Sequence, residues 1–143
     1  MVSVAIEKTF PNLKKAGYSI TSPKDIAYNC IAWAAHDTER WWWPNSNYHW
    51  PEKVPREETL ESFIRAYATI GFSPSSNASL ESGYEKIAIF VDSSRVPTHA
   101  ARQLPNGAWT SKLGKWEDIE HSTVNGLEGS TYGTVAVILA RPI

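Results

Sequence analysis

The sequence contains one cysteine and one methionine, and it has no apolar run as long as a membrane span. A single thiol cannot form an intramolecular disulfide, so nothing in the chain indicates an oxidising compartment. The segment Met-Val-Ser-Val-Ala-Ile-Glu-Lys at the start of the sequence lacks the basic region, apolar stretch and cleavage site of a signal peptide. We therefore predict a protein that is cytoplasmic as synthesised; export by a specialised route stays open.

An excess of charge of either sign is also missing. The chain has 14 Lys and Arg against 15 Asp and Glu, a formal net charge of −1. Because nucleic-acid binding requires a basic surface, we expect neither nucleic acid nor a membrane as a partner. With 143 residues, 42% of them hydrophobic, the chain is predicted to form a single domain spanning residues 1–143.

Tryptophan, in contrast, is abundant: the chain has seven, and five of them fall between residues 33 and 50. Residues 41–51 contain Pro44 and Pro51 beside several Asn and Ser residues, so this segment is predicted to be a loop. Its rings either cap the core or form a platform for a carbohydrate or peptide. In the second interpretation, Trp42 and Trp43 contact the substrate.

The remaining patterns predict an α+β fold, in which N-terminal helices pack on a C-terminal antiparallel sheet. A helix is expected from about Asn29 to His36 or Thr38, and another over 55–70, where apolar residues recur at helical spacing. Residues 86–92 and 132–139 have the composition of strands, and Asn106-Gly107 predicts a hairpin between 99–104 and 108–113. Residues 1–21, 72–83 and 115–130 are expected to be irregular, with one helical turn around 117–121.

The single cysteine, Cys30, follows Asn29, a favourable N-cap residue. If a helix begins there, Cys30 lies in its first turn, where the helix dipole favours the thiolate and a nucleophile. Ser22-Pro23 is a competing helix start that would place Cys30 two turns inside a helix. We therefore predict a short turn at 23–27 and the main helix from about Asn29. The alternative role for Cys30 is that of a small buried hydrophobic residue.

A thiol nucleophile needs a base and usually a third group that orients the base. Of the four histidines, His99 opens a predicted strand and is the best-placed base. The orienting group depends on the hairpin turn: a two-residue turn places Thr110 on the face of His99, and a three-residue turn with a bulge places Ser111 there. His121 is a third candidate, reached only through tertiary folding.

Other chemistries lack their sequence signals. The His, Cys and Asp residues do not have the spacing of a metal site, and the sparse glycines form no phosphate-binding loop. A nucleophilic serine of the GxSxG type is absent from the sequence, and the acidic pairs are typical of solvated helix starts. The sequence therefore implies neither a metal nor another cofactor.

This order of residues resembles the papain-like fold, and in particular the small bacterial cell-wall peptidases of NlpC type. The family sequence Asp-Cys-Ser-Gly corresponds to Asn29-Cys30-Ile31-Ala32, and the resemblance covers residues 18–139 as an order of elements. It implies Cys30 as nucleophile, His99 as base, Ser111 as the third catalytic group, and Tyr18 near the oxyanion, with Tyr28 as an alternative. The segments Tyr-Asn-Cys-Ile-Ala-Trp-Ala and Trp-Thr-Ser-Lys-Leu-Gly also resemble those of an uncharacterised bacterial family.

We therefore expect a thiol hydrolase or acyltransferase that acts on an amide or ester bond through Cys30 and His99. Backbone N–H groups around Asn29 would bind the oxyanion. Its substrate would be a peptide, a glycopeptide or a protein. Two alternatives follow from the same residues: a non-catalytic binding module that uses the loop 41–50, and a thiol-dependent toxin or effector.

Overall fold

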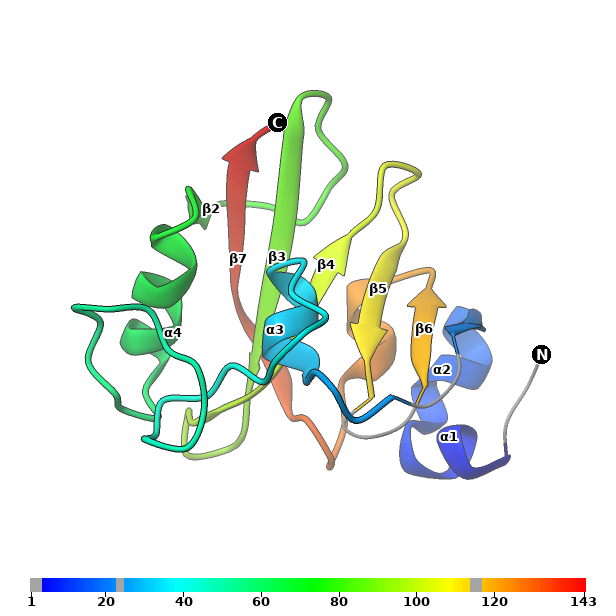
Figure 1. Ribbon diagram of the computed structural model, residues 1–143. Coiled ribbons are helices and arrows are strands. Elements are labelled where there is room, and N and C mark those ends of the chain that lie inside the picture. Colours follow the sequence, from blue (N-terminus) through cyan, green and yellow to red (C-terminus); the bar gives the residue numbers. More distant parts are fainter. Residues whose placement is uncertain (1–3, 23–24, 114–116) are drawn as a thin grey trace.

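The computed structural model describes residues 4–22, 25–113 and 117–143. Its seven strands form one antiparallel sheet in the order β1-β6-β5-β4-β3-β7-β2 (Figure 1). The strands are β1 (Tyr18–Ser22), β2 (Ser73–Ser75), β3 (Tyr84–Val91), β4 (Pro97–Gln103), β5 (Trp109–Lys112), β6 (Asp118–His121) and β7 (Thr134–Pro142). The helices are α1 (Val4–Thr9), α2 (Pro11–Ala16), α3 (Cys30–Ala34), α4 (Leu60–Ala68) and the short 3₁₀ helix η1 (Val124–Leu127).

The sheet is covered on both faces. Strand β3 shows why, because its side chains alternate between two apolar clusters. Ile87 and Ile89 pack in a first cluster with α3, α4 and the loop 41–51, called here the tryptophan loop. Ala88 and Phe90 pack in a second cluster with α1, α2 and η1. A strand buried on both faces reads as a continuous apolar run, which explains the clear signal of this segment in the sequence.

The predicted α+β class is confirmed, and several boundaries differ from the prediction. The helix expected over 55–70 begins only at Leu60, because the Thr59 hydroxyl accepts a hydrogen bond from the Ser62 N–H and caps the helix. Helix α3 begins at Cys30 as predicted but ends at Ala34, and His36 adopts a left-handed φ of 65°. Part of the predicted turn at 23–27, residues 23 and 24, lies outside the described residues.

Three segments that were expected to be irregular contain regular structure. Residues 1–21 contain α1, α2 and β1; the two helices have six residues each, too few for a clear periodic pattern. The helical turn expected around 117–121 is wrong, because these residues form β6, which pairs with β1 on one side and β5 on the other. A short strand, β2, lies within 72–83. In these segments tertiary pairing decided the conformation.

The hairpin between β4 and β5 has the longer of the two turns considered. The Leu104 N–H donates to the Ala108 carbonyl at 2.7 Å, so residues 105–107 form a three-residue turn, with Gly107 at a φ of 90°. This register places Ser111 on the face of His99. The ladder between β4 and β5 pairs only Arg102 with Thr110 and Gln103 with Trp109. Farther from the turn, the start of α3 packs against β4.

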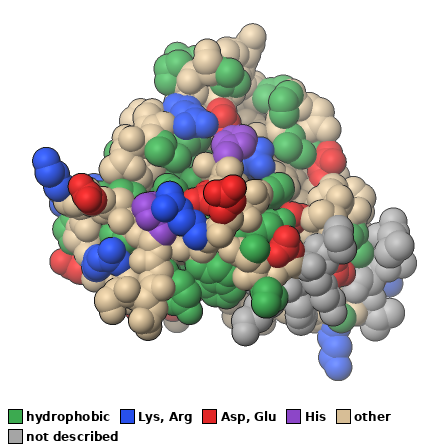
Figure 2. Space-filling view, viewed as in Figure 1, with side chains coloured by type: hydrophobic (Ala, Val, Ile, Leu, Met, Phe, Trp, Pro, Cys, Tyr) green, Lys and Arg blue, Asp and Glu red, His purple; other side chains and the backbone are tan. Residues whose placement is uncertain are grey.

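The surface gives no sign of a charged interface on the side that Figure 2 displays. Lys and Arg side chains alternate there with Asp and Glu side chains, and neither sign forms a continuous patch. Within the described residues, no helix has the length and apolar character needed to cross a membrane.

Candidate functional site

Cys30 is the first residue of α3, and the Asn29 side chain caps this helix. The Asn29 Oδ1 atom accepts hydrogen bonds from the N–H groups of Ala32 and Trp42, each at 3.1 Å, and its Nδ2 donates to the Trp42 carbonyl at 2.8 Å. One buried side chain therefore pairs a free backbone N–H at the start of α3 and fixes the tryptophan loop beside it. Asn29 thus sets the position of the aromatic wall relative to the Cys30 sulfur.

The thiol of Cys30 is buried, with 7% of the residue exposed. Burial raises its pKa to about 11, because a thiolate loses hydration when it leaves water. The backbone N–H groups of Ala100, Ile31 and Cys30 around the sulfur favour the thiolate and oppose this shift. The thiol is therefore neutral near pH 7, and the N–H groups around it favour any negative charge that forms there.

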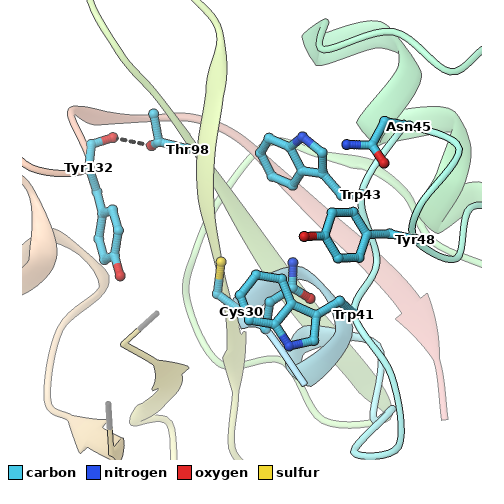
Figure 3. Close-up of a pocket in the computed structure, with 8 residues that line it drawn as sticks. Cys30, Trp41, Trp43, Asn45, Tyr48, Thr98 and Tyr132 are labelled. Carbon is cyan, nitrogen blue, oxygen red and sulfur yellow. Dashed lines mark hydrogen bonds between the residues drawn. The ribbon is translucent and has the colours of Figure 1, made fainter. Parts of the chain in front are cut away.

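A cavity of about 330 Å³ opens above the sulfur (Figure 3). Trp41, Trp43 and Tyr48 lie on one side of Cys30, and Thr98 and Tyr132 lie on the other. The Thr98 hydroxyl donates to the Tyr132 carbonyl, which joins β4 to the segment before β7. The lining consists of Asn29, Cys30, Trp41, Trp43, Asn45, Tyr48, Thr98 and Tyr132.

On the second-cluster face of the sheet, His99 begins a buried chain of hydrogen bonds. Its Nε2 lies 3.0 Å from the Ser111 Oγ, which lies 2.9 Å from the His121 Nε2. The His121 Nδ1 lies 2.8 Å from the carbonyl oxygen of Thr123. His99, Ser111 and His121 have no solvent exposure, and they come from three neighbouring strands, β4, β5 and β6.

The direction of this chain follows from its last member. A carbonyl oxygen can only accept, so the His121 Nδ1 carries a proton. Burial lowers the pKa of His121 to about 4, so this ring is neutral at pH 7 and its Nε2 accepts the Ser111 hydroxyl proton. Because the Ser111 hydroxyl donates its one proton to His121, it can only accept from His99, and His99 therefore donates through Nε2–H.

His99 is consequently left with a lone pair on Nδ1. Burial, and secondly the neighbouring His121, lowers the pKa of His99 well below its ordinary value, so the ring is neutral. Its Nδ1 has no hydrogen-bond partner among the described residues. The chain of hydrogen bonds thus selects the tautomer in which Nδ1 can act as a proton acceptor.

Helix α3, which begins at Cys30, packs against β4, which contains His99, and no hydrogen bond joins the two side chains in the described part of the chain. The Ala100 N–H that faces the sulfur belongs to the residue after His99. The Tyr132 ring lines the cavity with Cys30 and stacks on the imidazole, with centroids 4.1 Å apart and planes 9° from parallel. The sulfur packs in the first cluster and the imidazole packs beside Phe90 of the second, so the two groups lie on opposite faces of β4.

Other predicted site residues lie elsewhere. The Tyr18 hydroxyl donates to Glu7 at 2.7 Å, and Tyr18 belongs to β1 at the edge of the sheet, so it does not line the cavity. Tyr28 donates to Asp118 at 2.5 Å. Trp42 is buried in the first cluster with its indole N–H on Asp37, and Trp43 alone of the predicted pair lines the cavity.

Sequence reasoning missed five cavity residues, Trp41, Asn45, Tyr48, Thr98 and Tyr132. The first three lie in the loop 41–51 that was identified, but nothing in the local pattern separated them from Trp42. Tyr132 was assigned to the terminal strand, which begins only at Thr134. Its place against His99 depends on the return of the chain after η1. Among the described residues, no cluster of three His, Cys, Asp or Glu side chains could hold a metal ion.

Comparison with known protein families matches residues 19–140 to a domain of unknown function (DUF7689). The matched range contains Cys30, His99, Ser111 and His121. No curated protein and no solved structure matches the chain.

Proposed function

Since the chain belongs to the DUF7689 family, whose description assigns no activity, we propose from the site alone that it is a thiol hydrolase or acyltransferase. It would act on an amide or ester bond, with Cys30 as nucleophile, His99 as general base and Ser111 as the residue that orients the base. The proposal retains a papain-like order of catalytic groups, from a helix start to a strand and then to the next strand.

One observation carries the proposal: the buried chain from Thr123 through His121 and Ser111 ends at His99 Nδ1, whose lone pair has no partner among the residues that the structure describes. An unpaired buried polar atom is costly, and a purely structural histidine would find a partner for both ring nitrogens. The Tyr132 ring that stacks on this imidazole also lines the cavity that contains Cys30, and an unpaired imidazole nitrogen close to such a cavity has the properties of a general base.

The reaction would start from a neutral thiol. When a substrate carbonyl enters the cavity, the Cys30 thiol proton passes to His99 Nδ1 as the bond from sulfur to the carbonyl carbon forms. The negative charge moves to the carbonyl oxygen, where the N–H groups of Cys30 and Ile31 at the helix start can stabilise it. The bond to the leaving group then breaks, and His99 gives its proton to that group.

The acyl group is then attached to Cys30 as a thioester. Water or another acceptor attacks the thioester carbon and gives its proton to His99 Nδ1. The bond to sulfur breaks, and the proton returns to the thiolate, so the enzyme is restored. Water as acceptor gives hydrolysis, and an amine or alcohol gives transfer.

A specific observation favours a second candidate, a binding module without chemistry. The thiol pKa is raised to about 11 and that of His99 lies well below its ordinary value, so the resting pair is not a thiolate and an imidazolium. A cavity with aromatic walls could bind a ligand and leave this thiol unused.

The deciding experiment is to treat the native protein with an activated acyl donor, an acetyl thioester, and to detect the acylated protein by mass spectrometry. We expect a mass increase on Cys30 and turnover of the donor, both lost in Cys30→Ala. His99→Gln and Ser111→Ala should acylate more slowly, while His49→Gln, a change in the aromatic loop, should not.

Circular dichroism of each variant separates loss of chemistry from loss of fold. A folded native protein whose Cys30 is not acylated would overturn the proposal and leave the binding module. Equal acylation of native protein and folded His99→Gln would remove His99 from the mechanism.

A further inference from the structure

We infer that the cavity beside Cys30 is an acyl pocket that accepts an uncharged aromatic acyl group. This inference rests on the proposed function and names the class of its substrate. It follows from three properties of the cavity: the charge of its lining, the occupancy of its polar groups and the shape of its walls.

The lining offers no charged partner. All eight lining residues are described, and at neutral pH none carries a charge, since Cys30 and Tyr132 have raised pKa values. The nearby guanidinium of Arg56 is turned to the loop backbone, where it donates to the carbonyls of Asn45, at 2.5 Å, and Tyr48, at 3.3 Å. A carboxylate or ammonium group in this cavity would lose its hydration without compensation.

Most polar groups of the lining are already occupied. The Asn29 amide binds Ala32 and Trp42, the Trp41 indole N–H donates to Ile26 at 2.8 Å, and the Thr98 hydroxyl donates to Tyr132. A sugar presents many hydroxyl groups that each need a partner, and the lining leaves few. An apolar group needs none and gains from leaving water.

The walls are flat and held in place before any ligand binds. Trp41 stacks on Tyr48 with ring centroids 5.6 Å apart and planes 22° from parallel. Asn29 holds the start of the loop and Arg56 holds its far part. Flat, fixed rings favour a planar guest, because stacked or edge-to-face rings gain attraction beyond apolar contact. The cavity volume of about 330 Å³ admits one ring and its carbonyl above the sulfur.

The test compares three thioesters of N-acetylcysteamine that differ only in the acyl group: phenylacetyl, acetyl and succinyl. We expect phenylacetyl to acylate Cys30 at least ten times faster than acetyl, and the anionic succinyl ester to react more slowly than acetyl. Tyr48→Ala should remove most of the phenylacetyl preference, because it should lower the phenylacetyl rate more than the acetyl rate.

Tyr84→Ala is the matched control, because Tyr84 is exposed to a similar extent, 44% against 41% for Tyr48, and lies away from this cavity. It should keep the full preference. Equal rates for phenylacetyl and acetyl, or a preference for succinyl, would overturn the inference while the proposed function stood.

A binding measurement separates the two failures. Cys30→Ser cannot form the thioester, and titration with phenylacetamide should quench its tryptophan fluorescence. Binding of phenylacetamide without acylation of the native protein by any ester would retain the pocket for this class of ligand and remove the chemistry. Failure of phenylacetamide to bind would overturn the pocket directly.

Discussion

The reactivity of Cys30 toward a small thiol reagent should depend on pH in a way set by its burial. The native pKa is about 11, against an ordinary value of 9.0. At pH 8 the thiolate fraction is then about one hundredfold smaller than for an ordinary thiol. A more basic thiolate is also more nucleophilic, by about tenfold for this shift. The net expectation is a reaction about tenfold slower than that of a free thiol.

The assay measures the modification rate with methyl methanethiosulfonate, a small neutral reagent, between pH 6 and 11. The logarithm of the rate should rise by about one per pH unit over this whole interval. Steric shielding by the cavity walls lowers every rate equally, so the pH at which the slope begins to fall identifies the pKa. Because Cys30 is the only cysteine, modification is counted as a single mass increment. Protein unfolded in urea at the same pH provides the ordinary rate.

A rate that reaches a plateau near neutral pH would refute this reasoning, because it would show a thiolate already formed at low pH. Circular dichroism must accompany the series. The folded pKa lies above the unfolded value, so the native state binds the proton more tightly. The contribution of the neutral Cys30 thiol to stability is complete below pH 9 and is lost between pH 9 and 11. Rates taken where the protein unfolds report the unfolded thiol.

Two other predictions concern stability. His121 has a folded pKa of about 4 against an ordinary value of 6.5, so the fold gains stability from the neutral ring above pH 6.5. About 3 kcal/mol of the free energy of unfolding should be lost as the pH falls to 4. In urea unfolding, the stability of His121→Gln should depend less on pH over this interval, and an unchanged pH dependence would contradict the assignment. Asn29→Ala should lower the free energy of unfolding by about 3 kcal/mol, because it removes the cap and leaves two Trp42 backbone groups unpaired. Asn29→Ser should keep the cap and lose less; equal losses would show that the cap contributes nothing.

Local signals predicted a substantial part of the fold. The start of α3 was predicted because an N-cap amide acts within its own turn, and β3 because a strand buried on both faces is apolar throughout. Asn106-Gly107 predicted the hairpin, since the backbone of Gly107 needs a left-handed φ. The short helices α1 and α2 and strand β6 were missed, because each is stabilised mainly by partners distant in the sequence.

The candidate site divides in the same way. Cys30, His99 and Ser111 were all named from the sequence, although Ser111 and Thr110 stayed equivalent until the length of the turn was known. Tyr18 was misplaced, because the partner of a tyrosine hydroxyl depends on tertiary contacts, and its partner is Glu7.

The sequence by itself determined which chemical groups are present and which short segments begin a helix, form a strand or turn. These properties depend on neighbours within a few residues. The tertiary structure alone decided that Cys30 is neutral, that His99 carries its proton on Nε2 and that Tyr132 stacks on its ring. Protonation and tautomer depend on hydration and on hydrogen-bond partners, and these are supplied through space by strands and loops far apart in the chain.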